Sequence, residues 1–246
     1  VLKTLDFIRV INRSFYIQAT WNPERMLSLG YCFSLVPFIK KVFSNASDRI
    51  EFLKKNQDFF NTHPCMATFV MGSVIKLEEE HQEKGAPGKE QISRFKKRLS
   101  ESLAATGDQL FWAKIKPLAA MFGLGVALFA KTLGLGVFLL CYNVPQLYAR
   151  GVGLFKGYKH GFELTKKMTL GHSRKTAERL DRLAAFGSGA LLVTLGFSNY
   201  VSGTTEMVAF LASIVVMLGF LKIKMPIPLA LIILIVASTI VSGFIH

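Results

Sequence analysis

The sequence predicts an all-α integral membrane protein, with N-terminal amphipathic helices, a re-entrant or short-helix hairpin, and C-terminal transmembrane helices. Three observations favour this fold class. Of 246 residues, 51% are hydrophobic and the mean hydropathy is +0.36, which is high for a water-soluble protein of this length. Polar and apolar residues recur at helical spacing near the N-terminus. Three long segments near the C-terminus are almost free of charge.

The N-terminal segment is expected to be an amphipathic helix with a basic polar face. Such a helix can lie in the membrane interface, and an ordinary helix packed on the rest of the protein explains the pattern nearly as well. Residues 33–43 are a second amphipathic stretch, and residues 89–98 are typical of a solvated basic helix. In the first helix the polar residues are Lys3, Asp6, Arg9 and Arg13, and the apolar ones are Leu5, Ile8, Ile11 and Phe15.

Between these segments, the run from Phe59 to Pro64 predicts a sharp corner. Pro64 biases His63 away from helical geometry, so Asn61 or Thr62 can cap a helix from about residue 65 to 84. Near its end this helix carries Glu78, Glu79 and Glu80. Adjacent helical residues project about 100° apart, so at least one carboxylate is expected to face the protein. A charged helix end in water and a carboxylate site for ligand hydroxyls are both consistent with this run.

The apolar stretch 117–149 is too long for one membrane span and its halves are short. Lys131 interrupts it, and four glycines are spread along it. Two short helices, or a re-entrant hairpin buried in protein, explain it better than a simple crossing, with Lys131 at an interface or a turn. Further on, Gly153, Gly157 and Gly161 repeat every fourth residue, which predicts close helix packing on one face.

The C-terminal apolar segments are residues 183–205, 207–221 and 227–245. Lysine and arginine are concentrated in residues 150–182 and again near Lys222, which predicts that these two loops are cytoplasmic. The expected organisation has four parts. They are a cytoplasmic-side helical region 1–116, the hairpin 117–149, a basic cytoplasmic-side segment 150–182, and transmembrane helices 183–246.

Other classes of function fit the sequence less well. A net charge of +14 could indicate nucleic-acid binding, but basic loops beside apolar runs explain it better, so membrane lipid is the expected partner and nucleic acid is not. His63, His81 and Glu79 match no metal-ligand spacing. The three widely spaced cysteines indicate neither a disulfide nor a zinc site. No nucleophile stands beside a base, so we expect no catalytic residue, no metal and no cofactor.

Eight blocks, taken in order, resemble the IID subunit of mannose-family sugar phosphotransferase systems over nearly the whole chain. The chain departs from that pattern at Asn56, where the family usually has histidine, and at Glu101–Thr106, where it usually has Gly-Pro-Leu-Ala-Gly-Ile. The blocks are Arg13–Phe15, Gln18–Asn22, Glu24–Met26, Phe59–Pro64, Gly72–Glu80, Gly107–Trp112 with Lys116–Pro117, Tyr142–Pro145, and Gly157–Tyr158.

This resemblance implies a non-phosphorylated membrane subunit of the bacterial cytoplasmic (inner) membrane, multi-pass, in a trimer of IIC–IID units. Soluble IIA and IIB proteins would carry phosphate to a hexose of the mannose type, and the IIC subunit would share the translocation pathway. A divergent regulatory or scaffold subunit is the alternative. We expect Asp108 to lie close to the Glu78–Glu80 run. The candidate substrate or gating residues are Asn61, Thr62, His63, Glu78, Glu79, Glu80, Asp108, Trp112 and Asn143.

Overall fold

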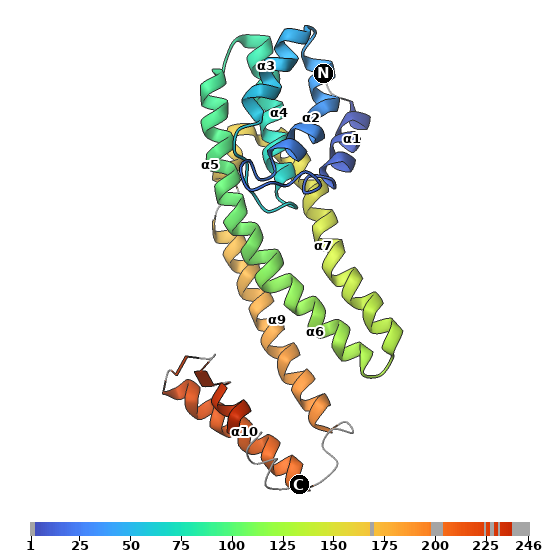
Figure 1. Cartoon of the computed structure of the whole chain (residues 1–246), viewed down its shortest axis with the longest axis vertical. Coiled ribbons are helices and arrows are strands. Elements are labelled where there is room, and N and C mark those ends of the chain that lie inside the picture. The colour runs from blue at the N-terminus through green and yellow to red at the C-terminus, as the bar shows by residue number, and fades with distance from the viewer. Residues whose placement is uncertain are drawn as a thin grey trace. The chain divides into compact units, whose positions relative to one another are not determined.

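The computed structural model describes residues 3–167, 170–197, 204–223, 225–226, 229–230 and 232–237. Every named element in these ranges is a helix, so the predicted all-α class is confirmed (Figure 1). The chain divides into two units, Val1–Gly187 and Ser188–His246.

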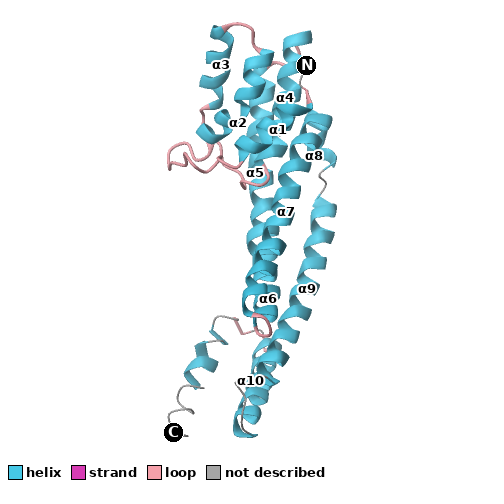
Figure 2. Cartoon of the chain, turned by 90° about the vertical axis from the view of Figure 1, so that its right-hand side faces the viewer, coloured by secondary structure: helices cyan, strands magenta, loops and turns pink. Residues whose placement is uncertain are grey.

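A bundle of five helices forms the N-terminal part of the first unit, with α4 at its centre (Figure 2). Helix α4 contacts α1, α2, α5 and α7. Val70, Met71, Val74 and Ile75 are each at most 1% exposed, because neighbouring helices surround the apolar first half of α4. The helices are α1 (Thr4–Ser14), α2 (Ser28–Val42), α3 (Ala46–Asn56), α4 (Ala67–Lys84) and α5 (Lys89–Gly107).

Helix α5 continues without a break into a second pair of elements. It is followed directly by the π-helix η1 (Asp108–Ile115) and then by α6 (Lys116–Ala127). After a short turn the chain returns as α7 (Lys131–His160), which packs against α6. Residues 117–149 therefore form a helical hairpin, and each arm is the end of a longer helix that projects beyond the bundle (Figure 1). Lys131, exposed, is the first residue after the turn.

The hairpin arms are apolar and mostly exposed. Among the described residues, Lys89–Ala127 and Lys131–Lys167 are long and apolar enough to cross a membrane. Leu140 on α7 is 65% exposed, and Phe129 at the turn is 83% exposed. Large apolar side chains exposed in this way are expected on a surface that faces lipid or a partner helix.

Close backbone contact joins α4 to α7. A Cβ atom on Gly72 would lie 2.1 Å from the carbonyl oxygen of Leu154, and one on Gly157 would lie 2.3 Å from the carbonyl oxygen of Phe69. Gly153 packs against Thr68 and the ring of Phe69. Gly161 does not take part in this contact in the same way. It is the residue at which α7 ends, and its φ of 47° is a conformation that glycine adopts most easily.

The chain continues through η2 (Gly161–Glu163), α8 (Leu164–Lys167) and α9 (Leu170–Phe197). Two boundaries between the parts expected from the sequence, 149/150 and 182/183, fall within the helices α7 and α9 and not in loops between helices. In the second unit, α10 (Thr204–Lys222) contains the apolar stretch Leu211–Phe220, which is shorter than a membrane span. Of the last expected transmembrane segment, only residues 229–230 and 232–237 are described, and they are helical.

The glycine contact predicts the effect of adding one methyl group. Gly72→Ala should destabilise the protein by about 2 kcal/mol or more, because the new Cβ meets backbone that cannot move aside without separating α4 from α7. Gly151→Ala on α7 is the matched control. Its Cβ would meet nothing within 4 Å, so it should raise stability by roughly 0.5–1 kcal/mol. Thermal unfolding in detergent compares them, and equal melting temperatures would contradict the packing argument.

Candidate functional site

A corner of the chain at Thr62–Pro64 packs against the π-helix. The imidazole of His63 stacks on the ring of Phe111, with centroids 4.9 Å apart and planes 16° apart, and meets Trp112 edge-on at 5.8 Å. Gly107 makes this contact possible, because a Cβ there would lie 2.2 Å from the Cβ of His63. The corner therefore joins the bundle to the foot of the hairpin.

Two polar groups at this corner are buried without a partner among the described residues. They are the hydroxyl of Thr62 and the Nε2 atom of His63. The Nδ1 atom of His63 accepts a hydrogen bond from the Cys65 amide at 3.3 Å. Burial lowers the pKa of His63, although the nearby Asp108 carboxylate acts in the opposite direction. His63 is therefore a neutral ring at pH 7, with one nitrogen available to a further group.

Helix α7 forms the other side of the corner. The thiol of Cys65 donates to the Gln146 side chain at 3.1 Å. One turn further along, the buried guanidinium of Arg150 donates to the Ser14 carbonyl at 2.7 Å and lies 4.9 Å from the Phe15 ring centroid. From the sequence, Arg150 is predicted only to belong to the basic segment 150–182. Its position beside an apolar run gave no signal that it would bind the end of α1.

The π-helix itself presents the exposed part of the site. A π-helix is rare and is frequently found at functional sites. Its first residue, Asp108, is exposed and forms no hydrogen bond or ion pair through its side chain with a described residue. Trp112, one turn further along, is 56% exposed. Thr62, His63, Asp108 and Trp112 are thus brought together, with the exposed Asn61 preceding them in the loop.

Asn143 does not belong to this group. Its side-chain amide donates to the Leu139 carbonyl of its own helix at 2.8 Å. It is exposed on α7.

The expectation that Asp108 lies beside the Glu78–Glu80 run is wrong. Helices α4 and α5 are antiparallel, so the end of α4 lies beside the start of α5. Asp108 follows the far end of α5, and 19 helical residues span roughly 28 Å at 1.5 Å per residue. The two acidic motifs are therefore at opposite ends of one helix and form no shared site.

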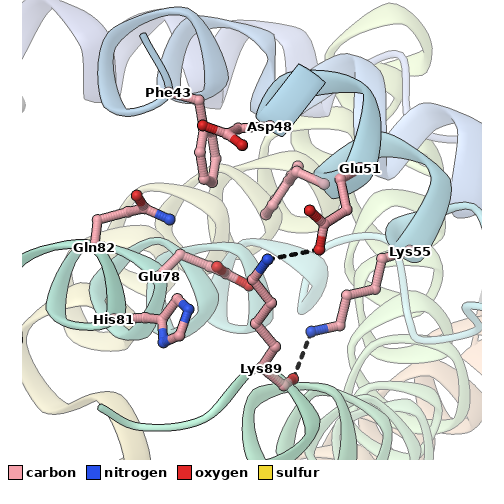
Figure 3. Close-up of a pocket in the computed structure, with 9 residues that line it drawn as sticks. Phe43, Asp48, Glu51, Lys55, Glu78, His81, Gln82 and Lys89 are labelled. Atoms are coloured by element: carbon pink, nitrogen blue, oxygen red, sulfur yellow. Dashed lines mark hydrogen bonds and ion pairs between the residues drawn. The ribbon is translucent and has the colours of Figure 1, made fainter. Parts of the chain in front are cut away.

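The three adjacent glutamates instead have three different surroundings. Glu79 accepts a hydrogen bond from the Tyr158 hydroxyl of α7 at 2.6 Å. Glu80 forms a surface ion pair with Lys76 at 3.2 Å. Glu78 is buried and lines a pocket between α3, α4 and the start of α5 (Figure 3). The rotation of about 100° per residue explains the divergence.

Lys96 is a buried charge that the sequence analysis did not single out. The ammonium group donates to the Asn56 side-chain oxygen at 2.8 Å and lies 4.4 Å from the Tyr31 ring centroid and 5.3 Å from that of Phe60. The expectation of a fully solvated helix over residues 89–98 is wrong at this position. Apolar residues at positions 92, 99 and 103 share its helical face, and that spacing was the available signal.

An all-helical bundle continued by an exposed apolar hairpin fits the class of all-α membrane proteins. Comparison with known proteins gives the particular family. Residues 1–246 match the phosphotransferase system (PTS) mannose/fructose/sorbose family IID component, and the chain belongs to this family.

Individual relatives agree with this assignment. The mannose-specific EIID component of Escherichia coli K12 is 34% identical over 188 residues, which cover 76% of this chain and 66% of that protein. The fructose permease IID component of Bacillus subtilis is 33% identical over 181 residues, covering 73% of this chain and 66% of that protein. A chain of the cryo-EM structure of the mannose transporter ManYZ with microcin E492 is 27% identical, with a TM-score of 0.63 and coverage of 99% of this chain and 97% of that chain.

The pKa of His63 predicts a pH effect on stability. Its value in the folded state is below the usual 6.5, so the unfolded state binds more protons as pH falls through 6.5. Stability that is present above pH 6.5 should therefore be lost progressively on acidification. His63→Gln keeps a polar side chain but removes the titration, so its melting temperature should fall less between pH 7 and pH 5. Parallel melting curves for both proteins would contradict a depressed pKa.

Proposed function

We propose that this IID subunit forms, together with a IIC subunit, the translocation pathway for a hexose of the mannose type that is phosphorylated on uptake. Soluble IIA and IIB proteins supply the phosphate, and the chain lies in the bacterial cytoplasmic membrane as a multi-pass subunit. IIC–IID units assemble as trimers. The observation that supports this function best is the exposed apolar hairpin in a chain of this family.

The glycines of the hairpin support a partner helix beside it. Gly123 and Gly134 lie at the contact between the two arms of the hairpin, because a Cβ on Gly134 would lie 2.5 Å from the Gly123 carbonyl oxygen. Gly125 and Gly136 have nothing within 4 Å of such a Cβ. Small residues on an exposed apolar helix allow a second membrane helix to approach closely. These two positions are available to a IIC helix.

The side chains at the corner support a role in gating the translocation pathway rather than a role in catalysis. Asp108 and Trp112 are exposed beside a buried, neutral His63, and the three residues sit where the bundle ends and the hairpin begins. A carboxylate and an indole at such a joint can contact a sugar or a IIC helix. We assign them to the pathway and assign no phosphorylated residue to this chain.

Sugar uptake tests the proposal. Cells that lack their own mannose-type system and co-express this chain with its IIC, IIB and IIA partners should accumulate radiolabelled hexose. Asp108→Asn keeps the shape of the side chain and removes the ionised acceptor, which is worth about 1.5–3 kcal/mol, so uptake should fall roughly ten- to a hundred-fold. Glu101→Gln, at an exposed position of α5, is the control and should transport normally.

The outcomes separate the competing functions. Uptake that is indifferent to Asp108→Asn would remove that carboxylate from the pathway. A complex that assembles in the membrane but accumulates no hexose would favour the regulatory or scaffold subunit.

A further inference from the structure

A pocket of about 230 Å³ lies at the end of the bundle, remote from the corner. Figure 3 shows its walls, which come from α3, from the last turns of α4 and from the first residue of α5. Because it is at the opposite end of α5 from Asp108, it is separate from the proposed translocation pathway. Its lining combines carboxylates, ammonium groups and the side chains of Phe43 and Phe52.

The charges of the pocket do not balance. Three carboxylates, Asp48, Glu51 and Glu78, line it together with two ammonium groups, Lys55 and Lys89. Both ammonium groups already have partners. Lys89 pairs with Glu51 at 2.6 Å, and Lys55 donates to the Lys89 carbonyl at 2.5 Å (Figure 3). The pocket therefore keeps one uncompensated negative charge, within a chain whose net charge is +14.

Glu78 is a buried carboxylate of this lining that lacks a partner. It is only 4% exposed, and its carboxylate forms no ion pair or hydrogen bond with any residue in the described part of the chain. Burial raises its pKa, although Lys55, His81 and Lys89 act in the opposite direction. Neither oxygen of this carboxylate is among the fully buried polar atoms that lack a partner, so the carboxylate faces the pocket and is accessible to a donor that enters it.

The lining indicates which donor fits. Phosphate and other anions are disfavoured by the excess of carboxylates. No group of three or more metal-ligating side chains occurs among the described residues, so the pocket is not built for a metal ion. A guanidinium or ammonium group matches the remaining features, because it donates to carboxylates in a charge-assisted way and packs well against aromatic rings.

We propose that this pocket binds a guanidinium or primary ammonium group, with Glu78 as its main acceptor and Asp48 as a second carboxylate. The cation comes either from a free amine or from a basic side chain of another transporter subunit. Only the second source rests on the proposed function.

Binding is tested on the purified full-length chain with methylguanidinium and its neutral isostere methylurea. Calorimetry should show saturable binding of methylguanidinium and at least ten-fold weaker binding of methylurea. Glu78→Gln should weaken methylguanidinium at least ten-fold. Glu83→Gln removes the same charge from an exposed position of α4 outside the pocket, and it should bind like the wild type. Thermal unfolding checks that Glu78→Gln is folded, and removal of an unpaired buried charge should raise its melting temperature.

The pH dependence adds an independent readout. Methylguanidinium binding should strengthen as pH rises through the raised pKa of Glu78, because only the ionised carboxylate attracts a cation. Asp48, Glu51, Lys55, His81 and Lys89 also face the pocket. The part of the pH profile that disappears in Glu78→Gln belongs to Glu78 itself.

Co-purification distinguishes the two sources of the cation. If a subunit inserts a basic side chain, Glu78→Gln should lose that subunit from the co-expressed complex while Glu83→Gln retains it. Saturable binding of methylguanidinium with intact assembly assigns the pocket to a free amine. The proposal is overturned if the wild type binds no methylguanidinium up to about 50 mM and Glu78→Gln assembles normally. Hexose uptake in the same cells reports separately on the proposed function.

Discussion

The close approach of α4 and α7 is the contact on which the rest of the first unit depends. Gly72 and Gly157 bring the two backbones together, and the Ser73 hydroxyl donates to the Gly157 carbonyl at 3.3 Å across the same contact. Helices held this close gain van der Waals contact along their length. Since α7 is one continuous helix, fixing its second half on the bundle also fixes the direction of its apolar first half. The hairpin thus extends directly from a packed core.

Buried charges then set the register of the elements around this pair. Asp6 of α1 binds Lys41 of α2, Arg150 of α7 binds the end of α1, and Glu79 of α4 accepts from Tyr158 of α7. A charge left unpaired in such a place is strongly unfavourable, so each partnership favours one alignment. Two groups differ from these pairs. The Nε2 atom of His63 is buried without a hydrogen-bond partner in the described chain, and the Glu78 carboxylate forms no ion pair or hydrogen bond with a described residue.

Periodicity and hydropathy were sufficient to predict the helical class and the apolar hairpin, because both depend on local pattern. The grouping of His63 with Trp112 depended on a family resemblance, and the structure supports the contact at 5.8 Å. The predicted proximity of Asp108 and Glu78 was wrong because it did not take into account that α4 and α5 run antiparallel, which places the two residues at opposite ends of α5. The buried position of Lys96 was missed for a similar reason, since its acceptor Asn56 lies 40 residues away in sequence.

The continuous helix from Lys89 to Ala127 connects the two features of interest, with the acidic pocket at its start and the corner in its middle. Regular hydrogen bonding makes an α-helix stiff, so a displacement at one end reaches the other unless the helix changes its winding between them. Within this helix the winding changes at η1, where His63 stacks on Phe111. The point at which this helix changes its winding is therefore also the point at which the stacking of His63 on Phe111 holds it against the bundle.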